Sequence, residues 1–195
     1  MTQNVISLSY MFSNCSSLKE IHLSNFNTQN VEDLDYMFSD CSSLKEINVS
    51  NFNTLNVKYM AGIFKNCSSL KKLNLSGFNT QNVEDMSYLF NGCQSLEEIN
   101  ISSFNTINVI KMKHMFSGCS LLKKIDLSHF KFNYVDISYM FSGCSLLNEV
   151  VLPNFNDSDI NKMNNLFSGC SNELKANIRK NYKNIADEAF LDEKE

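Results

Sequence analysis

The side chains in this sequence that are best suited to act as nucleophiles or metal ligands are its seven cysteines and three histidines. The cysteines are Cys15, Cys41, Cys67, Cys93, Cys119, Cys144 and Cys170. They recur every 26 residues, with one interval of 25. Such constant spacing predicts that each thiol occupies the same inward position of a repeated unit and packs as a small apolar side chain. The odd count argues against a disulfide framework, and the lack of closely spaced Cys and His pairs argues against a metal site.

The three histidines do not extend this set into a catalytic arrangement. His22, His114 and His129 fall at different positions of the repeat. No Ser–His–Asp or Cys–His constellation can therefore be assembled from one unit. The sequence also lacks a glycine-rich phosphate-binding loop. We expect a protein that is not an enzyme and that needs no cofactor.

Composition places the chain among single-domain globular proteins. It has 195 residues, of which 43% are hydrophobic and 19% charged, with a formal net charge of −4. This length is sufficient for one domain with a substantial core. The acidic balance disfavours direct nucleic-acid binding, and no apolar run reaches the roughly 18 residues of a membrane span. We expect no membrane insertion.

The sequence leaves two cellular locations open. The N-terminus lacks the basic-then-apolar pattern of a secretory signal, and unpaired thiols fit a reducing compartment. The chain as written is therefore expected in the cytoplasm. If it is a fragment of a longer surface protein, it is expected on the cell surface.

Aromatic and aliphatic residues follow the same period as the cysteines. A phenylalanine stands three residues before each cysteine: Phe12, Phe38, Phe64, Phe90, Phe116, Phe141 and Phe167. A leucine stands three residues after six of them: Leu18, Leu44, Leu70, Leu96, Leu122 and Leu147. This regularity predicts a solenoid, in which each coil buries its apolar side against its neighbours.

Each repeat divides into a helical pattern and a strand pattern. Between residues 30 and 41, apolar side chains fall at helical spacing, and Asn30 is a suitable N-cap. The residue before each cysteine is Asn, Asp or Gly, types that tolerate positive φ at a helix end. Residues 18–23 alternate between apolar and polar, which predicts a short strand. Because helices are wider than strands, the stack should curve with a parallel sheet on its concave side.

The repeat LxxLxLSxFxTxxVxxMxxMFxxCxSL resembles the BspA-like class of bacterial leucine-rich repeat proteins, from about Val5 to Cys170. The resemblance implies a leucine-rich-repeat solenoid used for adhesion or protein binding, commonly on the surface of bacteria or protists, without catalytic residues. We therefore expect an α/β solenoid of about seven strand–turn–helix coils of 25–26 residues over residues 1–170. A C-terminal capping helix and an acidic tail are expected over residues 171–195.

The two ends of the array differ. Apolar residues from Leu174 to Ala189 lie at helical spacing after Ser171, which predicts a terminal helix laid over the last coil. No comparable segment precedes the first coil. Either the chain is a fragment of a longer array, or its N-terminal end is covered by a partner or by a second copy.

The outward positions of the predicted strands form the first candidate binding surface. They are Glu20, His22, Glu46, Asn48, Lys72, Asn74, Glu98, Asn100, Lys124 and Asp126. Such a polar face of mixed charge suits another protein better than a small apolar ligand. The alternative is a solvated face on which Glu and Lys pair across neighbouring strands.

The second candidate surface is a deviation in the fifth coil, where one residue is deleted. His129, Lys131, Phe132 and Tyr134 form an aromatic and basic cluster there, and Tyr134 takes the place of a valine. Aromatic residues are frequent binding hot spots, so this edge is predicted to contact a partner. The alternative is a coil that is only repacked locally.

Two kinds of function fit these observations. The first is a non-catalytic recognition module that binds another protein, in surface adhesion or otherwise. The second is a small cytoplasmic inhibitor of another macromolecule, such as an immunity protein or an anti-CRISPR-like protein. The acidic pI of about 5.4 and the seven thiols are compatible with the second.

Overall fold

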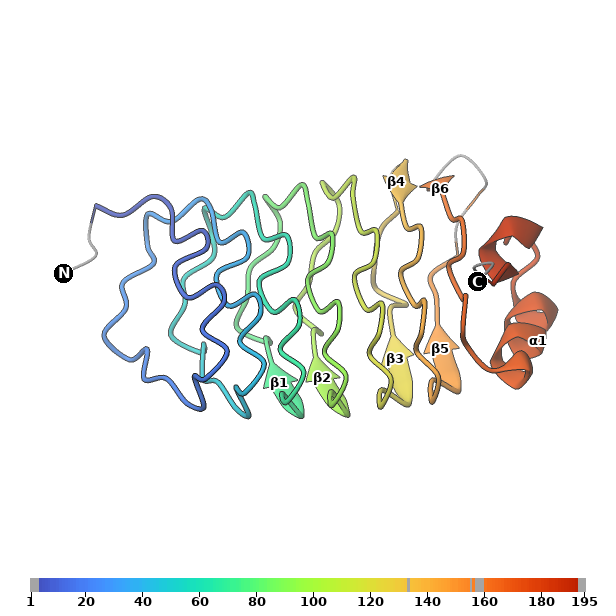
Figure 1. Ribbon diagram of the computed structural model, residues 1–195. Helices are drawn as coiled ribbons and strands as arrows, with labels where there is room; N and C mark the ends of the chain where they lie inside the picture. The colour runs from blue at the N-terminus through green and yellow to red at the C-terminus, as the bar shows by residue number, and fades with distance from the viewer. Residues whose placement is uncertain (1–3, 133, 155, 157–159, 193–195) are drawn as a thin grey trace.

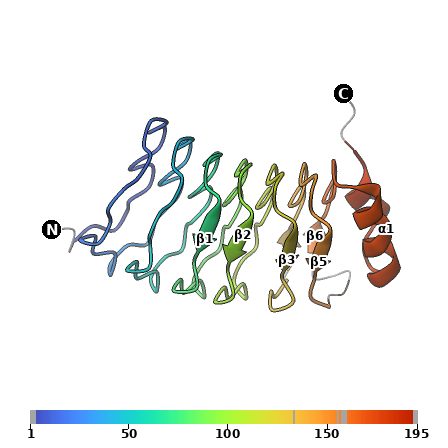
Figure 2. The same ribbon diagram turned by 90° about the horizontal axis from the view of Figure 1, so that it is seen from below.

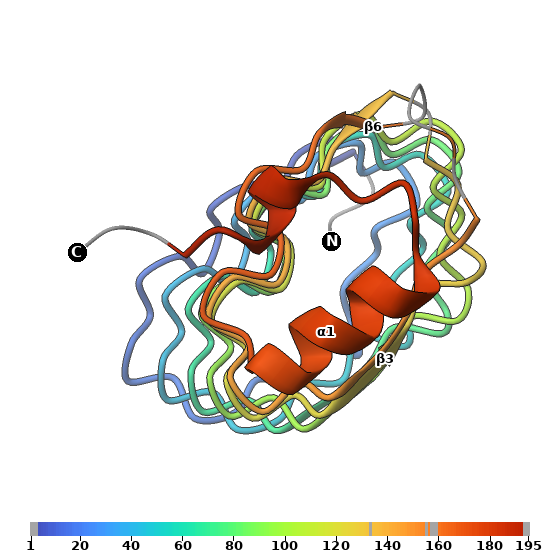
Figure 3. The same ribbon diagram turned by 90° about the vertical axis from the view of Figure 1, so that its right-hand side faces the viewer.

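The chain winds into successive coils that stand side by side in one row. The structure is a computed structural model that describes residues 4–132, 134–154, 156 and 160–192. Figure 1 shows the coils following one another from the N-terminus to a helix at the C-terminal end. Viewed along the row, they share one elongated outline (Figure 3). The expected solenoid is thus confirmed.

One long side of the row carries short parallel strands. They are β1 (Lys72–Asn74), β2 (Glu98–Asn100), β3 (Lys124–Asp126) and β5 (Glu149–Val151). β1 pairs with β2, and β3 pairs with β5, both in parallel. Figure 2 shows these strands on the face turned toward the viewer. The predicted strand position is confirmed in these coils, whereas residues 18–23 and 44–49 of the first two coils form no strand.

A second ladder runs along the opposite side of the row. It contains β4 (Val135–Asp136), which pairs in parallel with β6 (Ile160–Lys162). Isolated parallel bridges continue it through the earlier coils, and they join Ser7, Asp33, Tyr59, Asp85, Lys111 and Asp136 in turn. The apolar spacing of this segment predicts the start of a helix, so the ladder is a feature that the sequence pattern does not indicate.

The expected helices within the coils are not formed, and turns replace them. Tyr36 lies in the middle of the expected helix with a φ of 55°. A positive φ interrupts a right-handed helix. The N–H of Tyr36 donates instead to the carbonyl of Ala61 in the next coil (2.8 Å), while the N–H of Met37 closes a turn on Leu34 (3.2 Å). The backbone therefore divides its hydrogen bonds between local turns and the neighbouring coil.

The positive φ expected before each cysteine is confirmed. It occurs at Asn14, Asp40, Asn66, Gly92, Gly118, Gly143 and Gly169. These residues end a turn and not a helix. The described coils contain no helices, so the reason given for a sheet on a concave side no longer applies. The side that bears β1, β2, β3 and β5 is called the strand face below.

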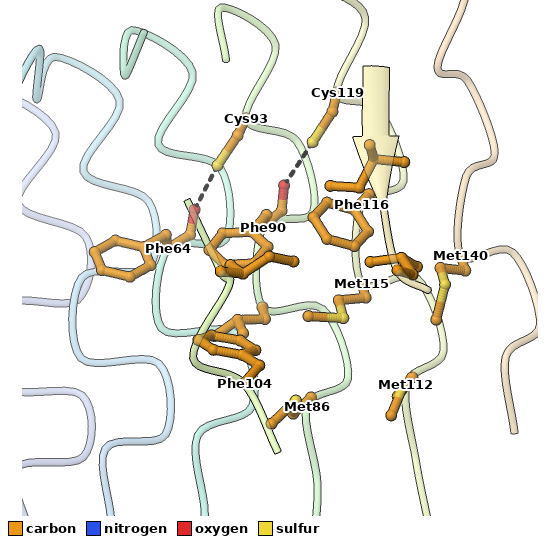
Figure 4. Packing of buried hydrophobic residues seen from close by; sticks show 14 of the residues in the cluster. Phe64, Met86, Phe90, Cys93, Phe104, Met112, Met115, Phe116, Cys119 and Met140 are labelled. Carbon is orange, nitrogen blue, oxygen red and sulfur yellow. Dashed lines mark hydrogen bonds between the residues drawn. The ribbon is translucent and has the colours of Figure 1, made fainter. Parts of the chain in front are cut away.

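Phenyl rings and thiols fill the axis of the solenoid. Successive rings of the first phenylalanine column stack, as in Phe64 and Phe90, whose centroids lie 6.1 Å apart. Beside them, Cys93 donates its S–H to the carbonyl of Phe64 (3.0 Å), and Cys119 does the same to Phe90 (3.2 Å), as Figure 4 shows. Six of the seven cysteines are buried, as expected, but Cys15 is exposed.

Polar side chains also join the coils. Thr54 donates through Oγ1 to the carbonyl of Asn79 (3.0 Å) and accepts from the N–H of the same residue (2.8 Å). Asn82 donates through Nδ2 to the carbonyl of Leu55 (2.7 Å). The asparagines at this position were expected to cap helices, and they link adjacent coils instead.

The C-terminal segment folds across the last coil (Figure 3). It contains helix α1 (Asn172–Asn181) and the short 3-10 helix η2 (Asp187–Phe190). Ser171 caps α1 by accepting from the N–H of Leu174 (3.1 Å), as its position predicted. The expected helix over the segment that reaches Ala189 is formed only as far as Asn181. Residues 182–186 belong to neither helix, and Ala189 lies in η2.

Candidate recognition face

The strand face exposes the residues that alternation predicted. In β1, β2 and β3 the first and third side chains are exposed, which places Lys72, Asn74, Glu98, Asn100, Lys124 and Asp126 in solvent. Glu20, His22, Glu46 and Asn48 are exposed as well, although their segments are not strands. The middle residues Leu73 and Ile125 are buried and anchor the strands to the core.

The polar column at the third strand position has a structural role. The side-chain oxygens of Asn74 and Asn100 accept from the N–H groups of Ser76 (3.0 Å) and Ser102 (3.2 Å). Asp126 accepts in the same way from Ser128 (2.8 Å). Hydrogen bonds from the side chain and backbone of Ser128 hold the pKa of Asp126 below its usual range. This carboxylate therefore contributes a fixed negative charge to the face.

Charges on the strand face come in like pairs that alternate from coil to coil. Lys71 and Lys72 are followed by Glu97 and Glu98 and then by Lys123 and Lys124, all of them exposed. The Nζ of Lys72 lies 2.9 Å from Oε1 of Glu98. An exposed pair of this kind contributes about 0–1 kcal/mol to stability. Lys71, Glu97 and Lys123 are not among the predicted binding residues, although they recur with the same period one residue before the exposed strand column.

The strand ladder is interrupted between β2 and β3. β2 pairs only with β1, and β3 only with β5, among the strands that the structure describes. Figure 1 shows β2 and β3 farther apart than the members of either pair. A depression of about 420 Å³ lies at this interruption, and it is lined among others by Asn100, Ser102, Lys124, Asp126 and His129. Charged and polar residues share the lining with apolar ones such as Ile99 and Val151.

A second depression lies nearer to the N-terminus on the same face. It has a volume of about 590 Å³ and is lined by Lys45, Glu46, Ser69, Lys71, Lys72 and Ser95. Three lysines surround it, so its charge is opposite in sign to that of the neighbouring Glu97 and Glu98. The face therefore offers a basic hollow beside an acidic pair.

The aromatic and basic cluster expected in the fifth coil does not form one surface. Phe132 is buried, with 6% of its surface exposed, because it takes the inward position of the buried threonines. Tyr134 is 67% exposed, and the valine position is filled by the buried Val135. Tyr134 directly precedes β4, on the side opposite β3 (Figure 1). Asn133 lies outside the described residues.

The remaining two members of that cluster are exposed. His129 lines the depression between β2 and β3, and its Nε2 lies 3.2 Å from the carbonyl of Ile101. The exposed Lys131 contributes its backbone N–H to Thr106 Oγ1 (2.7 Å). His129 is thus a member of the strand face, whereas Tyr134 is not.

Two kinds of site have no counterpart in the described parts of the chain. Among the described residues, no group of three or more His, Cys, Asp or Glu side chains is arranged to hold a metal ion. Within the same part of the structure, no helix has the length and apolar character needed to cross a membrane.

Comparisons with known proteins support the fold. No curated protein matches the sequence. Among solved structures, the chain is similar to a leucine-rich repeat protein of T. pallidum, with 18% identity and a TM-score of 0.58 over 96% of this chain and 79% of that one. It is also similar to a leucine-rich cell surface protein from Faecalibacterium prausnitzii A2-165, with 21% identity and a TM-score of 0.51 over 73% of this chain.

The chain spans only 35% of the Faecalibacterium protein, so the likeness concerns a part of that protein. A family model described as "Mycoplasma protein of unknown function, DUF285" matches residues 1–74 and 63–182. These matches agree with the BspA-like repeat and cover nearly the whole chain. The chain belongs to the DUF285 family and to the BspA-like class of leucine-rich repeat proteins.

Proposed function

We propose that this chain is a non-catalytic recognition module that binds another protein through its strand face. The observation that carries the proposal is the row of alternating like-charged pairs along β1, β2 and β3. An ordered pattern of charge selects a partner with the complementary order and speeds its association. A face that served only solubility would gain nothing from keeping two lysines or two glutamates side by side.

The depression between β2 and β3 supplies the second element of this surface. Asn100 and His129 are among the residues that line it, and an interface typically gains most of its energy from a few groups seated in such a hollow. Polar groups also fix the orientation of the bound partner. The proposed contact area is therefore centred on β2 and β3 and extends to the basic hollow around Lys71.

The array that presents this face is proposed to have about seven coils over residues 1–170, followed by a cover over residues 171–195. The column of cysteines and the stack of phenyl rings support this division. Binding to a surface of another cell and inhibition of a macromolecule inside the same cell both use such a module. We propose surface binding first, because longer proteins of similar fold include one described as a cell surface protein.

Site-specific cross-linking tests the proposal. A photo-reactive phenylalanine analogue is placed at Asn100 on the strand face or, as a control, at the exposed Glu84 beside the second ladder. We expect one partner to cross-link from Asn100 and not from Glu84, in the cells that make the protein or on the cells they contact. A partner found on the contacted cells would support adhesion, and a partner found inside the producing cells would support inhibition.

Charge reversal completes this experiment. Replacing Glu97 and Glu98 by lysine should abolish cross-linking from Asn100, whereas Glu84→Lys should leave it unchanged. Cross-linking that is equal from both faces, or that persists after the reversal, would contradict the proposed surface.

A further inference from the structure

The first exposed column of the strand face alternates in charge from one coil to the next. It consists of Lys72 in β1, Glu98 in β2, Lys124 in β3 and Glu149 in β5, all of them exposed. The strand registers place Lys72 beside Glu98 and Lys124 beside Glu149. When an alternating column of even length is reversed, each positive charge falls where a negative one stood. The column is therefore complementary in charge to a reversed copy of itself.

The strands that carry this column are arranged in a matching way. β1 pairs with β2 and β3 pairs with β5, so one pair of strands lies on each side of the interruption. A second copy can turn its strand face toward the first, related by a two-fold axis that runs parallel to the strands through the interruption. β2 then lies opposite β3 of the second copy, and β1 lies opposite β5. Each strand meets one of equal length.

Unlike charges face one another along the whole column in this arrangement. Glu98 lies opposite Lys124 of the second copy, and Lys72 lies opposite Glu149. Each contact occurs twice, because a two-fold interface uses the same patch on both copies. The ion pairs between described residues do not include Lys124 or Glu149, so both charges are available to a second copy. A two-fold axis along the row would instead set Lys72 against Lys72, and such a juxtaposition of like charges opposes association.

The columns on either side fit the same arrangement. In the column one residue earlier, Glu97 lies opposite Lys123 of the second copy, and the remaining positions set a lysine against an asparagine. At the third strand position, Asn100 lies opposite Asp126, so that an amide donor meets a carboxylate acceptor. The other positions of this third column set an asparagine against a valine. Like charges therefore do not meet in any of the three columns between β1 and β5.

We infer that the partner of the strand face is a second copy of this chain, bound in this reversed arrangement over β1, β2, β3 and β5. The inference rests on the proposed function, because it names the partner that the strand face binds. The depression at the interruption lies on the two-fold axis and faces the same depression of the second copy. Because exposed charges hold the two copies together, salt weakens the contact.

Charge exchange between two coils tests the arrangement, and sedimentation equilibrium of the purified protein measures it. The native chain should form a dimer at an ionic strength of about 0.05 M, where exposed charges are weakly screened. The double variant Glu97→Lys with Glu98→Lys should dimerise at least about tenfold more weakly, because lysines then face lysines. The double variant Lys123→Glu with Lys124→Glu should be weakened as much, because glutamates then face glutamates.

The matched control combines both exchanges in one chain. This fourfold variant has the native net charge and again sets unlike charges face to face, so it should dimerise as the native chain does. An equimolar mixture of the two double variants should likewise form a mixed dimer, although each variant alone is weakened. A two-fold axis placed between β1 and β2 would not give this recovery, because Lys72 would then lie opposite the lysine introduced at Glu98.

Four results would overturn the inference. The first is a native chain that remains monomeric at about 1 mM and low ionic strength. The second is a dimer that the double variants leave unchanged, and the third is a fourfold variant that is folded by circular dichroism but stays monomeric. If a variant does not fold, the salt dependence decides: the native dimer should weaken at least about tenfold between ionic strengths of about 0.05 and 0.5 M. A dimer insensitive to salt is the fourth contrary result.

Cross-linking from Asn100 distinguishes a failure of this inference from a failure of the proposed function. A different protein cross-linked from Asn100, together with a purified chain that remains monomeric, would refute the second copy as the partner and leave the proposed function intact. A chain that is monomeric and also cross-links to nothing from Asn100 would refute both.

Discussion

The thiol of Cys93 lies 3.0 Å from the carbonyl oxygen of Phe64, and the same oxygen accepts the backbone N–H of Cys67 at 3.1 Å. One carbonyl thus closes a turn in its own coil and is linked to the following coil. The arrangement recurs at each buried cysteine, from Cys41 to Cys170. The cysteine at this position therefore packs as a small apolar group and also acts as a hydrogen-bond donor.

Replacing Cys93 separates its packing from its hydrogen bond. Cys93→Ala removes a weak donor and leaves a small void, so we expect a loss of about 1–2 kcal/mol in the free energy of unfolding. Cys93→Ser keeps a donor for Phe64 and should lose less than Cys93→Ala. Urea unfolding measures both, with Cys15→Ala as the exposed control, expected within about 0.5 kcal/mol of the native protein. A serine variant less stable than the alanine variant would mean that the sulfur acts by packing alone.

Burial of these thiols also suppresses their reactivity. Removal from solvent raises the pKa of Cys93 to about 12 and that of Cys41 to about 11. The reactive thiolate is therefore scarce at neutral pH. This agrees with a packing role for the thiol ladder and leaves Cys15 as the site that reagents reach first.

Substituting Phe132 and Tyr134 tests the reassignment of the fifth coil. Phe132→Ala should cost about 3–5 kcal/mol of stability because it empties a buried position. Tyr134→Ala should change stability by less than about 0.5 kcal/mol, since that side chain is largely exposed. Thermal unfolding of both variants provides the measurement. Similar unfolding midpoints for Phe132→Ala and Tyr134→Ala would indicate that Phe132 is exposed.

The sequence predicted which residues face inward better than it predicted the backbone conformation. The inward positions of Leu34, Met37, Phe38 and Cys41 are correct, because apolar spacing reports burial directly. The helix inferred from the same spacing is wrong. A series of four-residue turns places side chains inward at intervals similar to those of a helix, and the deciding hydrogen bonds lie between coils, 25 residues apart in sequence.

For the strand face, too, the sequence predicted which residues are exposed but not how the coils pair. Alternation in Lys72, Leu73 and Asn74 identified the exposed column, since it depends on local pattern alone. The interruption between β2 and β3 could not be predicted, because both strands follow the same pattern of a polar, an apolar and a polar residue. Pairing between neighbouring coils depends on their relative displacement, and a repeat motif does not encode that displacement.

The carboxyl of Asp35 predicts a pH dependence of stability. Burial is the main cause that raises its pKa to about 6, and the hydrogen bond from the N–H of Ala61 (2.7 Å) opposes this only in part. The folded state therefore binds this proton more tightly than the unfolded state, and its contribution to stability falls as the pH rises from about 4 to above 6. Asp35→Asn keeps an acceptor for Ala61 and should be more stable than the native protein at pH 7, with the difference vanishing near pH 4.

Asp40 is the control, because its contribution to stability is expected to change with pH in the opposite direction. Hydrogen bonds from Ser39 (2.6 Å) and Asn66 (2.8 Å) lower its pKa, so its contribution is present at neutral pH and is lost as the pH falls. Asp40→Asn should therefore be less stable than the native protein at pH 7. Urea unfolding at a series of pH values distinguishes the two carboxyls, and parallel behaviour of the variants would contradict both assignments.

The ion pair between Lys175 and Asp192 predicts an asymmetric response to mutation. Lys175 on α1 is buried, and its Nζ lies 2.6 Å from Oδ1 of Asp192, an oxygen that also accepts the N–H of Gly169. Asp192→Ala leaves a buried ammonium group without its partner, and we expect a loss of about 1–3 kcal/mol. Lys175→Met replaces the cation by an apolar chain of similar length and should cost less, since Asp192 remains open to solvent and keeps its bond to Gly169.

Limited proteolysis measures this difference, because the pair holds the C-terminal segment against the last coil. Cleavage after Arg179 or Lys180 should accelerate strongly in Asp192→Ala and only slightly in Lys175→Met. The relative cleavage rates of the two variants identify the physical cause. If the unpaired buried charge of Lys175 is responsible, Asp192→Ala is cleaved faster than Lys175→Met. If α1 is held by apolar contacts alone, the two variants are cleaved at equal rates. Removal of the cover should in turn expose the N–H donors of Asn165 and Phe167, whose amide hydrogens would then exchange faster in Asp192→Ala than in the native chain.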